Sequence, residues 1–403
     1  MKVFKVARTN LLFGILALLV AGGAQGQSDT AEIKIGFVNP TTGPFGTLGK
    51  YARKGMDLAL EEAQNKPALK GLKFTVIERD SAGKAADAVR YARELISREG
   101  VDVLMGGLSS AECMSIQKIV AEEKIAYLPT SGCWADGFSS PSNVNKYSFR
   151  VTANNKQRNF AFADWLLKNV GKTWYLIYSD FAYGQSGAKA FQAAMKAKGG
   201  TVVGSVAVPF GTTDMAPYIG KIDKSAQGLY FILAGRDAIL GLQESAAQGL
   251  DKKMKLAGMQ SLIVAENFPK IPESAEGLSF IGAYPRDING PIDTTANQSF
   301  RALYLKKYPN DVVGLNAFEA YQATNALLKG IEKSGFRGRK DTEKFVAALD
   351  GSALEESTQF PAGTVTLRKD DNQGVGPLYI ARVKDGKEEV IHKIPASVVG
   401  NYK

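Results

Sequence analysis

The chain has 403 residues, 45% of them apolar and 22% charged, with 2 cysteines and a single histidine, His392. This composition is typical of a globular protein of two or three domains, and it excludes a disordered chain and a small disulfide scaffold. One histidine excludes a histidine-rich metal site, and we expect neither a metal nor another cofactor. The formal charge of +10 is spread without any run of five basic residues, so we expect no nucleic-acid partner.

The N-terminus has the three parts of a secretory signal peptide. Basic residues precede the apolar run Leu11–Ala21, and small residues follow it. As a helix this run would rise only about 16 Å, roughly half of the hydrocarbon core of a bilayer, which argues against a membrane anchor. We therefore expect residues 1–26 to be a signal peptide cleaved after Ala24 or Gly26. No cysteine stands at that site to carry a lipid, so the mature chain is expected to be free in the periplasm.

Strand-like and helix-like segments alternate after the signal peptide. Apolar runs predict strands at Ile33–Val38, Phe74–Ile77, Val101–Gly107 and Ile125–Thr130, with helices ending near Gln64 and covering 84–99 and 113–123. The alternation resumes with a strand at Tyr147–Val151, a helix near Gln157–Asn169, a strand at Thr173–Asp180, a helix from Gly184, and strands at 202–209 and Gly228–Gly235. Apolar strands alternating with helices are typical of parallel sheets covered on both faces. We predict an α/β fold of two doubly wound parallel-sheet lobes.

The C-terminal third has a different pattern. It predicts two longer helices at Thr295–Lys307 and Leu315–Lys333, followed by the segment 341–350 and by short strands at 363–367 and 377–383. We expect these elements to complete both lobes and not to form a third domain.

Four loops follow predicted strands, where ligands bind in open α/β sheets. They cover 39–49, 106–113, 129–137 and 179–187. The first lacks the G-x-G-x-x-G pattern of a dinucleotide site. The second runs from a strand directly into a helix, so Ser109 and Ser110 either bind an anion such as a carboxylate or cap the helix.

The two cysteines lie on neighbouring loops of this kind. Cys113 and Cys133 either form a disulfide in the oxidising periplasm, or Cys133 is a small residue that lines the pocket.

A secreted serine hydrolase is one alternative function. The run GLSSA at 107–111 is close to a G-x-S-x-G nucleophile elbow. Its only candidate base is His392, and the residues around His392 look like an ordinary edge strand, so we expect the protein not to be an enzyme.

Four segments together resemble a known family: IKIGFVNPTTGPFGTLG at 33–49, RDSAGKAADAV at 79–89, MGGLSSAE at 105–112 and YSDFAYGQSG at 178–187. In this order and spacing they resemble the periplasmic solute-binding proteins of branched-chain amino acid ABC importers, the leucine/isoleucine/valine-binding group with the type I two-lobe fold. The resemblance implies a monomer that binds a small solute between its lobes and delivers it to a membrane permease. A ligand sensor on the same fold is the alternative.

The resemblance also implies how the lobes are divided. Three crossings between them would lie near Arg150–Thr152, Gly282–Tyr284 and Thr358–Gly363. Lobe 1 would comprise 27–150 plus 284–358, and lobe 2 would comprise 151–283 plus 359–403.

A ligand site follows from the same resemblance. The ligand carboxylate would be held by the serines and backbone of lobe 1, with a leucine as pocket wall and an aromatic residue from lobe 2. The candidate site residues are Leu48, Ser109, Ser110, Ser131, Gly132, Cys133, Tyr183, Arg236 and Gln260.

Two of these positions depart from the family pattern. Gln260 stands where the family has the acid that pairs with the ligand's ammonium, and Arg236 replaces a tyrosine. A buried ammonium without a carboxylate costs several kcal/mol, whereas an arginine offers bidentate pairing to a carboxylate. The ligand is then a carboxylate without an amino group, such as a small aromatic acid beside Phe45, Trp134 and Tyr183.

The alternative is a branched-chain amino acid. In that case Arg236 points to solvent, and Glu266 or Asp237 pairs with the ammonium.

Overall fold

The computed structural model describes residues 1–2 and 31–403. The cleavage site and apolar run of the predicted signal peptide therefore lie outside the described residues. None of the helices in the described part of the chain is long and apolar enough to cross a membrane.

The first sheet is parallel and has the strand order β2-β1-β3-β4. Its strands are β1 (Ala31–Asn39), β2 (Leu72–Asp80), β3 (Val103–Gly106) and β4 (Ala126–Leu128), and they are connected by α1 (Gly46–Ala63), α2 (Ala85–Ser97) and α3 (Ser110–Glu123). The central strand β1 is apolar because both faces are covered: Ile35 lies beside Val76 of β2 and Val103 of β3. We call this sheet and its helices lobe 1.

The second sheet has seven strands in the order β14-β13-β9-β8-β7-β5-β6. The parallel strands are β5 (Thr173–Ser179), β6 (Thr201–Val208), β7 (Gly228–Ile232), β8 (Lys255–Met259) and β9 (Ser279–Gly282), and an antiparallel hairpin of β13 (Leu378–Lys384) and β14 (Lys387–Ile394) extends them. The helices here are α4 (Asn155–Asn169), α5 (Ala182–Lys198), α6 (Ala216–Ile219), α7 (Gly235–Ala247) and α11 (Ala396–Val399). We call this sheet and its helices lobe 2.

The C-terminal third contributes elements that pack against both sheets. After α8 (Thr295–Lys307), the helix α9 (Leu315–Ser334) packs along α1, and α10 (Thr342–Leu349) packs against α9. A small antiparallel sheet of β10 (Ala353–Leu354), β11 (Val365–Leu367) and β12 (Gly374–Val375) follows before the chain enters β13 of lobe 2. Short 3-10 helices lie at Gly43–Phe45, Pro67–Leu69, Asp136–Ser139, Gln260–Leu262, Glu273–Ala275, Gly290–Ile292 and Arg339–Asp341.

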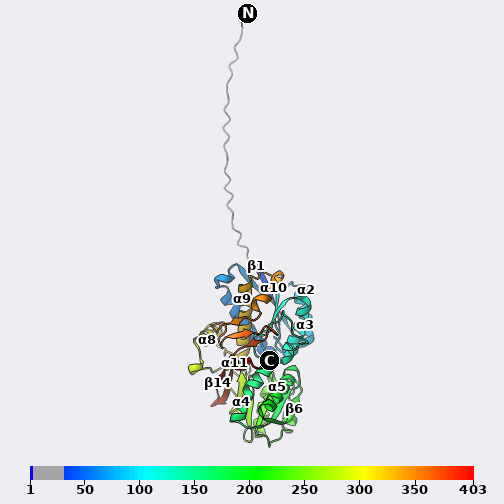
Figure 1. Cartoon of the computed structure of the whole chain (residues 1–403), viewed down its shortest axis with the longest axis vertical. Helices are drawn as coiled ribbons and strands as arrows, with labels where there is room; N and C mark the ends of the chain where they lie inside the picture. The colour runs from blue at the N-terminus through cyan, green and yellow to red at the C-terminus, as the bar shows by residue number, and fades with distance from the viewer. Residues whose placement is uncertain (3–30) are drawn as a thin grey trace.

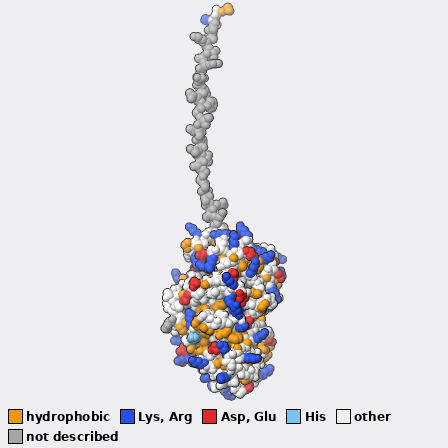
Figure 2. Space-filling view, viewed as in Figure 1, with side chains coloured by type: hydrophobic (Ala, Val, Ile, Leu, Met, Phe, Trp, Pro, Cys, Tyr) orange, Lys and Arg blue, Asp and Glu red, His pale blue; other side chains and the backbone are white. Residues whose placement is uncertain are grey.

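The two lobes lie one above the other along the long axis of the molecule (Figure 1). Helices α2, α3, α9 and α10 belong to the upper half of the view, and α4, α5 and β6 belong to the lower half. On the face in view, acidic and basic side chains are interspersed over both lobes (Figure 2), which fits the dispersed charge of the sequence.

One of the segments predicted as strands differs in the structure. The predicted strand at Tyr147–Val151 makes only isolated bridges, from Ser148 to Tyr127 and from Arg150 to Gln373. No element is predicted for 236–294, which holds most of α7 together with β8 and β9, and none is predicted for α6, β10, β12 or α11.

Strand order places one cavity between the lobes. The order reverses between β1 and β3 in lobe 1 and between β5 and β7 in lobe 2. At such a switch point the loops after the two strands diverge and leave a crevice at the carboxyl edge of the sheet. Residues that follow all four of these strands line the same cavity.

Candidate functional site

About 470 Å³ of atom-free space lies in this cavity, open solvent at its entrance included. Its lining is made of Phe45, Leu48, Leu108, Ser109, Ser110, Gly132, Cys133, Trp134, Phe181, Tyr183, Ala234, Gly235, Ser261, Val264, Leu315 and Asn316. None of these described lining residues is charged. The cavity is therefore apolar and aromatic, with a few hydroxyl, amide and backbone groups for orientation.

The polar side of the cavity begins at the N-terminus of α3. The Ser109 hydroxyl accepts a hydrogen bond from the backbone N–H of Glu112, at 3.3 Å, and the Glu112 carboxylate accepts one from the N–H of Ser109, at 2.8 Å. This is a capping box, so the capping alternative holds for Ser109. The Ser110 hydroxyl accepts from the N–H of Ala135 at 3.0 Å, and its own proton remains available for a ligand oxygen.

The wall beside Ser110 is the 131–135 loop after β4. Gly132 has φ +61°, and a Cβ there would lie 2.2 Å from the Leu108 carbonyl oxygen, so the position requires glycine. Cys133 is also in the left-handed region, with φ +58°. Its side chain forms a disulfide with Cys113 of α3, with 5.9 Å between the Cα atoms. Both expectations for Cys133 are met, because it is bridged and it lines the cavity.

Aromatic side chains of the two lobes meet across the cavity. Trp134 of lobe 1 packs edge-on against Tyr183 of lobe 2, with 5.6 Å between ring centroids. Phe45 of lobe 1 stacks on Phe210 of lobe 2 at 4.9 Å and lies 6.4 Å from Phe181. Such pairs add about 0.5–1.5 kcal/mol each beyond area burial, so they stabilise the contact between the lobes.

On the lobe 2 side, two hydroxyl groups are linked. The oxygens of Tyr183 and Ser261 lie 2.6 Å apart, and Ser261 donates to the carbonyl of Leu233 at 2.8 Å. Burial raises the pKa of Tyr183 well above its ordinary value. Tyr183 is therefore a neutral donor at the cavity wall.

Six of the nine candidate site residues line the cavity: Leu48, Ser109, Ser110, Gly132, Cys133 and Tyr183. Ser131 does not line the cavity, but its hydroxyl donates to Asn316, which does, at 2.5 Å.

The other two candidates lie outside the cavity lining. Arg236 is exposed on the first turn of α7, so the expected bidentate pairing with a ligand carboxylate has no support. Gln260 is buried, and its amide bonds the backbone N–H and C=O of Tyr284. These bonds hold the backbone after β9.

The sequence analysis missed several lining residues. Leu315 and Asn316 come from the start of α9, and Ser261 and Val264 follow β8. Leu315 and Asn316 are the first two residues of the helix predicted at Leu315–Lys333, so the N-terminus of that helix could have pointed to them. The strand that precedes the other two lies in the segment without a prediction.

Asp237 and Glu266, the two acids that could pair with an ammonium, both form hydrogen bonds within the protein. Asp237 accepts from the N–H of Gly211 at 2.9 Å. Glu266 accepts from the N–H of Asn316 at 2.7 Å and from its amide at 3.2 Å, while its second oxygen is buried without a protein partner. Burial raises the pKa of Glu266. Asn316 therefore stands between Glu266 and the cavity.

The geometry does not support a serine hydrolase. Ser109 belongs to lobe 1, and its hydroxyl is used in the cap of α3. His392 is exposed on β14, the edge strand of lobe 2, opposite Ile380.

Comparison with known proteins identifies the family. A family model described as periplasmic binding protein matches residues 32–388. The chain belongs to the periplasmic binding protein family. Within it, this protein is of the type I fold and the branched-chain amino acid transporter group.

Curated relatives and solved structures agree with this assignment. The Leu/Ile/Val-binding protein homolog 6 of Brucella suis is 25% identical, with 92% of this chain and 93% of the relative aligned. A substrate-binding protein from Sphaerobacter thermophilus has a TM-score of 0.81 at 24% identity, covering 91% of this chain and 98% of that one. A solute binding protein from Rhodopseudomonas palustris HaA2, solved with p-hydroxybenzoic acid, has a TM-score of 0.80 at 25% identity, covering 91% and 97%. The leucine binding protein LivK from Thermotoga maritima has a TM-score of 0.75 at 20% identity, covering 90% and 99%.

Family membership sets the class of the protein. Its homologues are solute-binding proteins and not enzymes, and the family implies a periplasmic location, a small-molecule ligand and an ABC permease as partner.

Proposed function

We propose that this periplasmic binding protein is the solute-binding component of an ABC importer for a small aromatic carboxylate. The acid lies between the lobes, and its closed complex delivers it to the permease. The ring fits the aromatic wall of Trp134, Phe181 and Tyr183. The carboxylate faces Ser110 and the backbone of Gly132 and Cys133.

One observation carries the choice of an anion. The cavity is lined by first-turn or N-cap residues of five helices: Leu48 of α1, Ser110 of α3, Phe181 of α5, Gly235 of α7 and Leu315 of α9. Each helix directs its first-turn N–H groups and the positive end of its dipole there.

Side chains neutralise only some of these helix ends. Glu112 completes the cap of α3, Glu266 binds the first turn of α9, and Asp237 lies in the first turn of α7. The N-cap residues of α1, α5 and α7 make no side-chain cap. A carboxylate gains from such an environment, whereas an ammonium finds no carboxylate among the described lining residues.

Lobe closure is the mechanism that this geometry supports. Ser110 and Trp134 come from lobe 1, and Tyr183 and Ser261 come from lobe 2. A ligand that contacts both sides binds the closed form more tightly and shifts the equilibrium toward it.

A thermal-shift series tests the ligand class. Benzoate, 4-hydroxybenzoate and 3,4-dihydroxybenzoate are compared with leucine, isoleucine and valine, and 4-hydroxybenzamide is the uncharged control. A ligand at 100-fold its dissociation constant stabilises the native state by about 2.7 kcal/mol, a shift of a few degrees. We expect the acids to raise Tm and the amide to have little effect. A shift with leucine alone would overturn the proposal.

A branched-chain amino acid is the second candidate. The buried free oxygen of Glu266 favours it, because rotation of Asn316 would bring an ammonium within reach of that carboxylate. The Glu266→Gln variant would then lose leucine binding, while binding of an aromatic acid would persist.

Three further expectations belong to the same proposal. The signal peptide is cleaved near residue 26, the mature chain is a monomer, and the lobes comprise 27–150 with 284–358 and 151–283 with 359–403. Mass spectrometry and light scattering of the secreted protein test the first two, and limited proteolysis tests the third. Loss of ligand uptake in a strain that lacks the protein would separate transport from sensing.

A further inference from the structure

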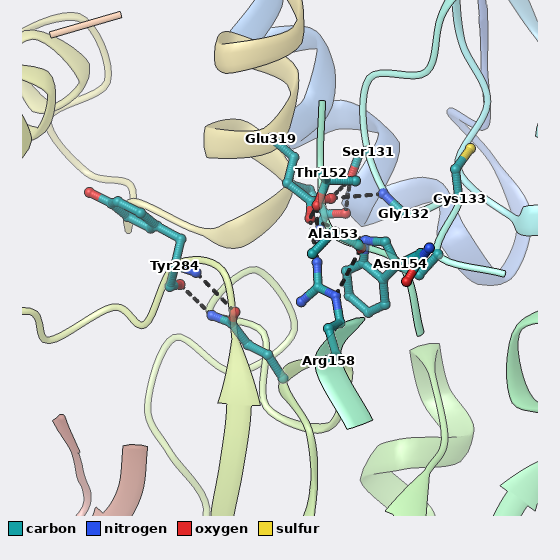
Figure 3. A network of polar contacts seen from close by, with 12 residues as sticks. Ser131, Gly132, Cys133, Thr152, Ala153, Asn154, Arg158, Tyr284 and Glu319 are labelled. Carbon is teal, nitrogen blue, oxygen red and sulfur yellow. Dashed lines mark hydrogen bonds and ion pairs between the residues drawn. The ribbon is translucent and has the colours of Figure 1, made fainter. Parts of the chain in front are cut away.

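A buried ion pair joins the lobes directly behind the cavity wall. Arg158 of α4 in lobe 2 and Glu319 of α9 in lobe 1 lie 3.2 Å apart, with side-chain exposures of 0% and 1%. Figure 3 shows the two side chains at the centre of a polar network. Neither residue lines the cavity.

Glu319 holds the 131–135 loop from behind. Its carboxylate accepts from the N–H of Gly132 at 2.9 Å and from the indole N–H of Trp134 at 3.1 Å. It also accepts from the hydroxyl of Thr152 at 2.7 Å, on the segment that leads from lobe 1 to lobe 2. The same carboxylate thus touches two lining residues and the connection between the lobes.

Arg158 completes the network from lobe 2. Its guanidinium donates to the carbonyl of Ala153 at 3.1 Å and to the Thr152 hydroxyl at 3.0 Å. The same group stacks over the ring of Trp134 at 4.1 Å. Trp134 is therefore held from behind by both members of the pair while its ring faces the cavity.

Burial makes this pair sensitive to any change in the lobe angle. Burial raises the pKa of Glu319 and lowers the pKa of Arg158, and the attraction between the two groups opposes both shifts. Separating them would leave two buried charges without a counter-ion, which is unfavourable. The ion pair therefore favours the relative orientation of the lobes in which the two groups meet.

We propose that the Arg158–Glu319 pair is a positioning device that couples the cavity wall at Gly132 and Trp134 to the relative orientation of the lobes. It rests on the proposed function, in that a ligand occupies this cavity. Affinity for that ligand then depends on two residues that do not touch it.

The first test compares Glu319→Gln with Glu388→Gln. Glu388 forms a second buried pair, with Arg286 at 3.0 Å, and lies outside the cavity lining. Both variants are expected to lower Tm. Only Glu319→Gln should weaken binding, by about tenfold, as measured by calorimetry with 4-hydroxybenzoate, or with leucine if the wild type binds leucine. Equal affinities of the two variants would overturn the proposal.

The second test separates positioning from stability. The double variant Arg158→Met/Glu319→Gln removes both charges and keeps an acceptor for the N–H of Gly132. Neutral replacement of a buried pair often restores stability. We therefore expect Tm to recover relative to Glu319→Gln while the affinity stays low. Recovery of affinity together with Tm would show that the pair only stabilises the fold.

A third variant tests the geometry of the guanidinium, and hydrogen exchange tests the pair without a ligand. Arg158→Lys keeps the charge but loses the planar fork, so it should fold and still bind more weakly. If the wild type binds neither 4-hydroxybenzoate nor leucine, the proposed ligand fails, and amide hydrogen exchange of the 131–135 loop tests the pair alone. Faster exchange in Glu319→Gln than in Glu388→Gln supports the coupling, and equal exchange refutes it.

Discussion

The two walls of the cavity are built differently. In lobe 1 the 131–135 loop is held by the disulfide to α3, by Glu319, by the Ser110 hydroxyl and by Arg150. In lobe 2 the wall combines two aromatic rings, Phe181 and Tyr183, with small and aliphatic residues, and its described polar ties are short links such as that of Tyr183 to Ser261. Lobe 1 therefore fixes where a polar group of the ligand can bind, whereas lobe 2 provides a surface against which a ring of the ligand can pack.

The largest expected effect comes from Arg150, which is fully buried in lobe 1. Its guanidinium donates to the carbonyls of Cys133 at 2.6 Å and Ala135 at 2.8 Å. Burial lowers its pKa to about 10, so it stays charged at neutral pH. Arg150→Met should cost about 3 kcal/mol of unfolding free energy, because it leaves buried carbonyls without donors. Urea denaturation measures the loss, and the exposed Arg90→Met is the control. Equal stability of the two variants would contradict the conclusion that Arg150 holds the 131–135 loop in place.

The second prediction concerns the disulfide of the same wall. The Cys113→Ser/Cys133→Ser variant should lose about 3 kcal/mol of stability by the loop-entropy argument. Its ligand affinity should change little, because Arg150 and Glu319 still hold the loop in the folded state. Reduction of the wild type by dithiothreitol should give the same result. A large loss of affinity would mean that the other ties do not suffice.

The third prediction compares two neighbouring serines. Ser110→Ala should weaken binding of an anionic ligand by about 1.5–3 kcal/mol, since the lost hydrogen bond is to a charged group. Ser109→Ala should instead lower stability by about 1 kcal/mol through loss of the cap, with affinity nearly unchanged. Calorimetric titration and thermal unfolding of both variants measure the two effects. Unchanged affinity in Ser110→Ala would remove that hydroxyl from the site.

The smallest effect is expected in lobe 2. Tyr183→Phe removes a neutral hydrogen bond to Ser261 and keeps the ring, so affinity or stability should fall by only about 1 kcal/mol. Ser261→Ala is the matched partner variant. A loss as large as that of Ser110→Ala would show that the lobe 2 wall also binds a polar group of the ligand.

The sequence predicted the strand-end loops of this site well and its side-chain directions poorly. Apolar periodicity identifies strands such as β1 and β5, and the loops after them reach the cavity because parallel strands end at one edge. Periodicity says nothing about which first-turn residue of a helix points inward. Arg236 and Gly235 are neighbours on α7, and only the glycine lines the cavity.

The remaining features of the site depend on contacts between residues that lie far apart in the sequence. Glu319 lies 187 residues from Gly132, and no local pattern relates the two. The departure at Gln260 was visible in the sequence, but its bonds to the backbone of Tyr284 were not. The absence of a carboxylate among the described lining residues, and not Gln260 alone, disfavours an ammonium in this cavity.

The single bridge between α3 and the 131–135 loop has a consequence for how the protein is made. The chain has 2 cysteines, so only one intramolecular pairing exists and no isomerase is needed to correct it. Thiols stay reduced in the bacterial cytoplasm and are oxidised after export. A chain that is still inside the cell therefore lacks this tie and is less stable than the exported one. Maturation of this protein requires an oxidant but no disulfide shuffling.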